Sequence, residues 1–205
     1  MATLEEFYAY AGSPIDLQHF EDIFNSTGSD KSARHNYHEV YSALFNRREF
    51  VDNILEIGIY LGGSLRSWKI LFENSDILGL DYERNFFIQE DRIQCMYVDQ
   101  RDIRTFYDVY KSVGGKTYDF IVDDGCHNPI ETLTTFNAAL PWLNKGGWFI
   151  VEDIRLADEL TWQIVSDTLP SNYKAFLINM NHLRDMENDP HGLKDNIVLA
   201  VKRIG

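Results

Sequence analysis

The sequence predicts an α/β fold in which a mostly parallel β-sheet carries helices on both faces and ends in an antiparallel strand pair. Several short apolar runs each end within one or two positions of an acidic residue, as buried parallel strands do before a turn. Helix-length segments separate most of these runs. Such alternation, joined by right-handed crossovers, gives a parallel sheet between two helical layers. The 205 residues, 44% of them hydrophobic, suffice for one compact domain.

The first part of the chain, residues 1–50, is expected to form a helical cap or lid segment ahead of a core at residues 51–205. Its apolar side chains recur at spacings of three and four, as at Leu4, Phe7 and Tyr8. The predicted strands of the core cover residues 53–57, 76–80, 93–98, 118–122, 147–151, 173–180 and 196–201. A polar loop over residues 181–194 joins the last two, which we expect to pair antiparallel.

Charge and cysteine content limit the classes of function. The net charge of −13 disfavours a groove that tracks nucleic-acid phosphates, because such grooves need clustered Lys and Arg. No apolar run approaches the roughly 18 to 20 residues of a membrane span. Glu5 and Glu6 stand where a signal peptide would be basic, and Cys95 and Cys126 are the only cysteines. We therefore expect a cytoplasmic protein with a small-molecule partner, no nucleic acid and no membrane.

A glycine turn follows the first predicted strand, in Leu55-Glu-Ile-Gly-Ile-Tyr-Leu-Gly-Gly-Ser64. Gly58 and Gly62 let the backbone approach a ligand, and a helix begins near Ser64. The spacing is not the G-x-G-x-x-G phosphate fingerprint, which disfavours a nicotinamide dinucleotide. Glu56 beside the turn would repel a pyrophosphate and attract an ammonium group. The turn therefore favours a cationic, amino-acid-like ligand, although glycines after strands are common in any α/β protein.

The next two predicted strands end in polar residues that suit a nucleoside. Asp81 stands about twenty residues after the glycine turn, where a carboxylate can accept hydrogen bonds from both ribose hydroxyls. Asp99 and Gln100 follow the third strand and are candidate partners of an adenine amino group. Asp81 and Asp99 could each instead be plain helix N-caps.

A second motif combines carboxylates with a histidine. The fourth and fifth strands run into Val122-Asp-Asp-Gly-Cys-His127 and Val151-Glu-Asp-Ile154. Adjacent parallel strands would bring Asp124, Glu152 and Asp153 together, and clustered carboxylates are balanced by a cation such as Mg²⁺ or Ca²⁺. His127 could remove a substrate proton. Alternatively, His127 caps a helix, and the two acids of the fifth strand are solvated loop charges.

The glycine turn, Asp81 and the Asp99-Gln100 pair together resemble the class I methyltransferases that use S-adenosylmethionine (SAM). That resemblance implies a Rossmann-like sheet of seven strands. It also implies that the turn holds the methionine part of SAM, Asp81 holds the ribose, and the residues after the third strand flank the adenine. The resulting candidates for cofactor binding are Glu56, Gly58, Gly62, Ser64, Asp81, Asp99, Gln100, Asp123, Lys31 and Tyr37.

The resemblance narrows to the metal-dependent sugar O-methyltransferases of macrolide biosynthesis and their cephalosporin-hydroxylase-like relatives. Asp124-Gly-Cys-His127 is similar to their D-G-S-H motif, with Cys126 in place of serine, and Glu152-Asp153 is similar to their E-D pair. This implies Asp124, Glu152 and Asp153 as metal ligands, and His127 with Asp124 as the catalytic residues.

The segment Thr27-Gly-Ser-Asp-Lys31, followed by His35, Tyr37 and Tyr41, is similar to the G-T-D-K…H…Y segment of the same enzymes. That similarity places Lys31 and Tyr37 near the carboxylate of SAM. Some relatives carry a large additional N-terminal domain for assembly that this sequence lacks, and a homo-oligomer remains possible. We expect an O-methyltransferase that uses SAM and Mg²⁺ on a hydroxyl of a sugar or glycosylated small molecule. The alternatives are a catechol-like small diol as acceptor, or a non-catalytic protein that binds SAM or a nucleotide.

Overall fold

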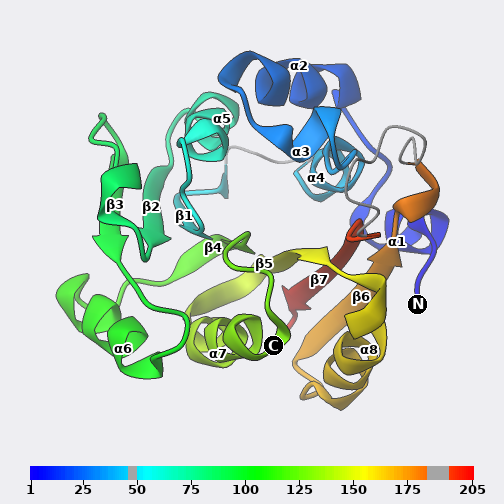
Figure 1. Cartoon of the computed structure of the whole chain (residues 1–205). Helices are drawn as coiled ribbons and strands as arrows, with labels where there is room; N and C mark the ends of the chain where they lie inside the picture. The colour runs from blue at the N-terminus through cyan, green and yellow to red at the C-terminus, as the bar shows by residue number, and fades with distance from the viewer. Residues whose placement is uncertain (46–49, 184–193) are drawn as a thin grey trace.

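The computed structural model describes residues 1–45, 50–183 and 194–205. Its centre is a seven-stranded sheet of order β3-β2-β1-β4-β5-β7-β6 (Figure 1). Only β7 runs antiparallel to its neighbours, β5 and β6, so the predicted mostly parallel sheet with a C-terminal antiparallel pair is confirmed. The strands are β1 (Asn53–Ile57), β2 (Asp76–Asp81), β3 (Ile93–Tyr97), β4 (Tyr118–Asp123), β5 (Leu143–Ile154), β6 (Tyr173–Asn179) and β7 (Ile197–Arg203).

Helices cover both faces of the sheet (Figure 1). One face carries α1 (Leu4–Ala11), α2 (Leu17–Thr27), α3 (Asp30–Ala33), α4 (His38–Leu44) and α5 (Gly63–Leu71). The other carries α6 (Ile103–Ser112), α7 (Pro129–Ala139) and α8 (Glu159–Thr168). Short 3₁₀ helices occupy Arg84–Phe86, Leu140–Trp142, Leu156–Asp158 and Asn181–Leu183. Among the described residues, no helix is long and apolar enough to cross a membrane. Most of the predicted loop over 181–194 lies outside the described residues.

The two faces bury separate hydrophobic clusters because successive side chains of a strand point to opposite sides. In β1, Ile54 joins the cluster under the N-terminal helices, and Leu55 joins the cluster under α6 to α8. Glu56 therefore points back toward the N-terminal helices, and it is fully buried there. A carboxylate at such a position needs a partner from the covering helices.

Aromatic side chains fix the N-terminal helices to the sheet. The rings of Phe24 and Trp68 meet edge to face with centroids 5.3 Å apart, and Tyr41 approaches Trp68 to 5.0 Å. Trp68 in turn packs on Phe120 of β4 at 5.2 Å. Edge-to-face pairs of this kind each contribute roughly 0.5–1.5 kcal/mol beyond the area they bury. The N-terminal segment is thus held in one position against the strands that carry the site.

Two local features shape the carboxyl edge of the sheet. Gly58 has a φ of +95°, and a Cβ atom there would lie 2.0 Å from the carbonyl oxygen of Asp124, so only glycine lets the ends of β1 and β4 meet. In β5 the pairing with β7 shifts between Val151 and Ile154. A bulge of this kind re-aims side chains. The residues between, Glu152 and Asp153, are the predicted acidic pair.

Candidate active site

An open cavity of about 810 Å³ lies at the carboxyl ends of the parallel strands. Segments that follow β1, β2, β3 and β4 line it, together with the end of β5 and residues 28–34 of the N-terminal segment. Of the predicted site residues, the lining includes Gly58, Ser64, Asp81, Asp99, Gln100, Asp124, His127 and Asp153. The other predicted residues lie behind this lining: Lys31, Tyr37, Glu56, Gly62, Asp123 and Glu152.

Asp81 holds the glycine turn and still faces the cavity. Its Oδ2 accepts a hydrogen bond of 2.7 Å from the backbone N–H of Ile59, and its Oδ1 accepts one of 2.8 Å from Glu83. The backbone N–H of Tyr60 adds a longer hydrogen bond of 3.4 Å to Oδ2. A carboxylate has about four lone-pair positions, so these three bonds leave about one position on Oδ1 for a ribose hydroxyl. Asp81 thus lines the cavity, and its contact with a ribose stays a prediction.

The predicted adenine partners are already bonded within the protein. Both carboxylate oxygens of Asp99 pair with Arg101, at 2.8 and 2.9 Å, and these hydrogen bonds lower the pKa of Asp99. The amide nitrogen of Gln100 donates to Asp123 at 3.0 Å and to Thr135 at 2.8 Å. Its amide oxygen accepts the backbone N–H of Cys126 at 2.9 Å. Gln100 thus ties the segment after β3 to β4 and α7.

Asp123 lies behind the cavity wall as the anchor of Gln100. Its carboxylate also accepts the backbone N–H of Gly125 at 3.2 Å. Burial raises the pKa of Asp123 to about 7. The adjacent turn residue, Cys126, is a free thiol, and burial raises its pKa as well, so the sulfur is not activated as a nucleophile.

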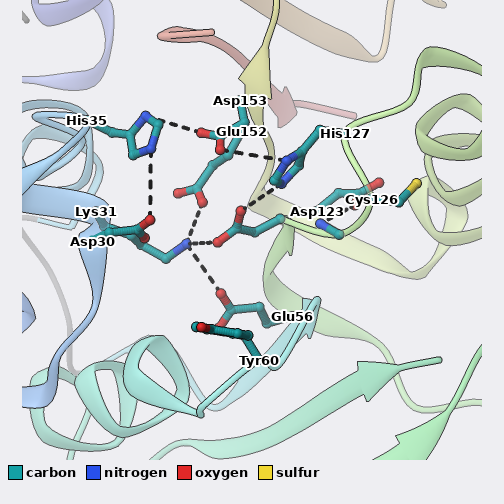
Figure 2. Close-up of polar contacts among 12 residues, drawn as sticks. Asp30, Lys31, His35, Glu56, Tyr60, Asp123, Cys126, His127, Glu152 and Asp153 are labelled. Atoms are coloured by element: carbon teal, nitrogen blue, oxygen red, sulfur yellow. Dashed lines mark hydrogen bonds and ion pairs between the residues drawn. The ribbon is translucent and has the colours of Figure 1, made fainter. Parts of the chain in front are cut away.

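Lys31 supplies the partner that the buried carboxylates require (Figure 2). Its ammonium is 2.6 Å from Asp124 Oδ2, hydrogen-bonds to Glu152 and lies 3.4 Å from Glu56 Oε1. The side chain is only 1% exposed. Burial by itself lowers the pKa of Lys31, but the carboxylates outweigh it and hold the pKa well above its usual value. Tyr41 donates the second hydrogen bond to Glu152. We call Lys31, Glu56, Glu152 and Tyr41 the inner cluster.

The predicted role of Lys31 at the carboxylate of SAM must be compared with its bonds in this structure. The segment that contains it does cover the cavity, through Ser29, Asp30 and Arg34. The Lys31 side chain, however, turns inward, because the strand alternation that buries Glu56 places a carboxylate beneath it. The predicted contact between Lys31 and the carboxylate of SAM stays a prediction, and it would require the ammonium to leave the inner cluster.

Asp124, His127 and Asp153 line the cavity and form an outer cluster. Figure 2 shows His127 and Asp153 of this cluster. His127 Nε2 is 3.1 Å from Asp124 Oδ1, and His127 Nδ1 is 3.8 Å from Asp153 Oδ2. One possible ligand atom from each of the three residues lies within 4.8 Å of the others. His127 and Asp153 both have left-handed backbones, with φ of +54° and +53°. Such conformations are costly for residues other than glycine, and they cluster at functional sites.

The electrostatics of the outer cluster follow from its paired charges. Burial lowers the pKa of His127, but the hydrogen bond to Asp124 and the charge of Asp153 outweigh it and raise the pKa to about 9. Burial would raise the pKa of Asp124, yet Lys31 and His127 hold it well below its usual range. Burial raises the pKa of Asp153. The cluster therefore holds excess negative charge that a cation would balance.

Tyr37 and His35 support Asp153 from behind. The Tyr37 hydroxyl donates to Asp153 Oδ1 at 2.6 Å and accepts the backbone N–H of Asp153 at 3.1 Å. His35 stacks on the Tyr37 ring and is 3.3 Å from the same Oδ1. The predicted contact of Tyr37 with SAM therefore also stays a prediction, since its hydroxyl is occupied. The similarity of Lys31, His35, Tyr37 and Tyr41 to one family segment was the available signal that these four side chains belong to the site.

Sequence reasoning missed several other lining residues. Glu131, in the first turn of α7, has a buried Oε2 atom with no hydrogen-bond partner. Tyr60 and Phe86 were not missed, because the sequence already offers them as aromatic candidates for an acceptor pocket; both line the cavity and pack edge to face at 5.5 Å beside the glycine turn. Arg34 and Arg155 also reach the cavity. No periodic pattern marks these residues, because they lie in turns or at helix starts.

Comparison with known proteins identifies relatives of this chain. Residues 55–154 match the family described as a methyltransferase domain. The 8-demethyl-8-alpha-L-rhamnosyl tetracenomycin-C 2'-O-methyltransferase of Streptomyces olivaceus is 32% identical over 136 residues, 62% of this chain and 35% of that protein. The demethylmacrocin O-methyltransferase of Streptomyces fradiae is 35% identical over 108 residues, 49% of this chain and 27% of that protein. The chain thus spans about a third or less of the length of these curated relatives.

Solved structures give the same fold. MycE methyltransferase from the mycinamycin biosynthetic pathway, in complex with Mg, SAH and mycinamycin VI, superposes with a TM-score of 0.68 at 22% identity. The superposition covers 90% of this chain and 53% of that chain. The class I fold and the resemblance to sugar O-methyltransferases, both predicted from strand-end motifs, are confirmed.

Proposed function

We propose that this chain, which contains a methyltransferase domain of the class I fold, is a SAM-dependent O-methyltransferase acting on a sugar hydroxyl of a small-molecule acceptor. The observation that carries the proposal is the outer cluster at the wall of the cavity. The same cavity is lined by Gly58 and Asp81, where the methionine and ribose parts of SAM are expected. A methyl donor and an acceptor hydroxyl bound in one cavity would meet beside Asp124, His127 and Asp153.

The acidic residues of the outer cluster fit a divalent cation. Asp124 and Asp153 offer oxygen atoms of the kind that Mg²⁺ prefers, close enough together to share one ion. A bound Mg²⁺ would act as a Lewis acid toward the acceptor oxygen. The resemblance implies Glu152 as a third ligand, a prediction that stays untested. The present proposal leaves Glu152 in the inner cluster, because its two oxygens are bonded to Lys31 and Tyr41 and would have to be released.

His127 is assigned as the proton acceptor of the reaction. Asp124 holds the ring by accepting a hydrogen bond from Nε2, which leaves Nδ1 with the lone pair. The carboxylates of Asp124 and Asp153 raise the pKa of His127 to about 9, so without a cation the imidazole carries a second proton at neutral pH. The base role therefore requires a cation at those carboxylates, which would favour the neutral ring. Since the sulfonium of SAM is already activated, alignment and removal of one proton are what the protein must supply.

Methyl transfer from isotopically labelled SAM tests the proposal directly. We expect Mg²⁺-dependent methylation of rhamnosides or related glycosides, with catechol as the comparison acceptor. In His127→Ala, turnover should fall by roughly 10²–10⁴-fold while the affinity for S-adenosylhomocysteine (SAH) changes little. The matched control is His19→Ala, at an exposed histidine of α2, which should keep full turnover.

Three outcomes would count against parts of this proposal. Equal losses of turnover and SAH affinity in His127→Ala would remove the proton-acceptor role. Methylation of catechol alone would change the acceptor to a small diol. Binding of SAH without transfer to any acceptor would indicate a non-catalytic binder. A cytoplasmic location and a homo-oligomeric state stay predictions for cell fractionation and light scattering.

A further inference from the structure

The adenine end of the proposed cofactor site lacks an assigned hydrogen-bond acceptor. The resemblance places adenine beside the segment after β3, where Asp99 and Gln100 line the cavity. The carboxylate of Asp99 is held on both oxygens by Arg101. The amide of Gln100 is bonded at both its oxygen and its nitrogen to β4 and α7. The amide of Gln100 cannot receive the amino group of a purine without giving up a partner. Asp99 keeps only the second acceptor position of Oδ2, the oxygen that also binds Arg101.

Glu131 offers an acceptor oxygen that carries no hydrogen bond within the described part of the protein. It lines the same cavity, and its Oε2 atom is buried with no hydrogen-bond partner. A buried carboxylate oxygen without a partner is costly, and in a cavity wall a water molecule or a bound ligand supplies the missing donor. Its Oε2 is thus a candidate for a contact made only in the ligand-bound protein.

The position of Glu131 also matches the adenine end. Glu131 and Thr135 stand four residues apart on α7, so they lie on the same face of that helix. Thr135 bonds to the amide of Gln100, which brings that face against the segment after β3. The inner cluster, by contrast, lies behind the cavity wall, with Lys31 and Tyr41 supplied by the N-terminal helices on the opposite side of the sheet. Glu131 therefore stands on the face of α7 that contacts the segment expected to flank the base.

We propose that Glu131 recognises the adenine of SAM by accepting a hydrogen bond at Oε2 from the exocyclic amino group at C6. This inference rests on the proposed function, because it requires SAM in the cavity. A carboxylate only accepts hydrogen bonds, whereas the 6-oxo group of hypoxanthine is itself an acceptor. Two acceptors would then face each other without a donor between them. Glu131 should therefore select 6-amino purines over 6-oxo purines.

Calorimetric binding of two product analogues tests the proposal without needing turnover. The ligands are SAH and S-inosyl-L-homocysteine, which differ at C6 of the purine. Wild-type protein should bind SAH roughly ten- to a hundredfold more tightly, the range expected when a buried polar group is left unpaired. In Glu131→Gln the amide can donate or accept, so the preference should fall to about threefold or less.

Two further variants make the result specific. Glu159→Gln removes a matched first-turn glutamate from α8, outside the lining of the cavity, and should retain the wild-type preference. Asp99→Asn tests the competing assignment and should also retain it. Thermal melts of all variants confirm that each protein is folded before binding is compared.

The outcomes separate this inference from the proposed function. Loss of the preference in Glu131→Gln alone supports the role of Glu131. Retention of the preference in Glu131→Gln, or its loss in Asp99→Asn alone, overturns the role of Glu131 while leaving the proposed function intact. Failure of the wild-type protein to bind either ligand overturns both.

Discussion

Glu152 and Asp153 are neighbours in the sequence with the same charge, yet the fold gives them different surroundings. Glu152 is buried in the inner cluster and bonds to Lys31 and Tyr41. Asp153, turned by the bulge in β5 and by a φ of +53°, reaches the cavity beside His127. Two acidic residues that are adjacent in the sequence can therefore have different roles. We infer that one carboxylate stabilises the fold beneath the site and the other serves the chemistry.

Removing the cation of the inner cluster should have the largest effect. Lys31→Met leaves Glu56, Glu152 and Asp124 without their shared ammonium, and a broken buried pair costs roughly 3–5 kcal/mol. We expect the free energy of unfolding in urea to fall by about that amount. The control is Lys116→Met, whose partly exposed pair with Asp76 should contribute at most about 1 kcal/mol. Equal losses in the two variants would contradict a structural inner cluster.

Removing the shared carboxylate should have a smaller effect on stability. Glu152→Ala leaves the Tyr41 hydroxyl without its acceptor, while Lys31 keeps its pairs with Asp124 and Glu56. We expect a loss of about 2–3 kcal/mol in the free energy of unfolding. Urea unfolding of Glu152→Ala beside wild type measures it. A variant as stable as wild type would mean that Glu152 is not held in the folded protein as described.

The smallest change in the inner cluster removes one hydroxyl. Tyr41→Phe keeps the ring that packs on Phe24 and Trp68 but deletes one hydrogen bond to Glu152. We expect a loss of about 1–2 kcal/mol, since the acceptor is a buried carboxylate. The matched comparison is Tyr37→Phe, which deletes the bond to Asp153 in the outer cluster. If both hydroxyls had a purely structural role, the two variants would have the same activity. We expect instead that Tyr37→Phe weakens cation binding and that Tyr41→Phe does not.

The sheet and its site edge could be predicted from the sequence because their signals are local. Apolar runs, the glycine turn and the acids at strand ends occupy consecutive positions, so Asp81, Asp124 and Asp153 were placed at one edge from spacing alone. The resemblance to sugar O-methyltransferases depended on the same short motifs.

Contacts between distant segments could not be predicted in this way. Lys31 meets Asp124 across 93 positions and Glu152 across 121. The inward direction of the Lys31 side chain depends on the face of β1 that carries Glu56. Alternation along the strand shows that Glu56 and Leu55 point to opposite faces, but only the fold shows which helices cover each face. Likewise, Gln100 is polar and follows a strand, but only the fold shows that its amide nitrogen donates hydrogen bonds to Asp123 and Thr135.

The division between the two acids is tested most directly by Mn²⁺ binding, followed by electron paramagnetic resonance, in wild type, Asp153→Asn and Glu152→Gln. Mn²⁺ takes the place of Mg²⁺ and prefers the same oxygen ligands. We predict saturable binding in wild type and Glu152→Gln, and affinity at least roughly tenfold weaker in Asp153→Asn. Loss of binding in Glu152→Gln, with Asp153→Asn unchanged, would contradict the account and make Glu152 the cation ligand.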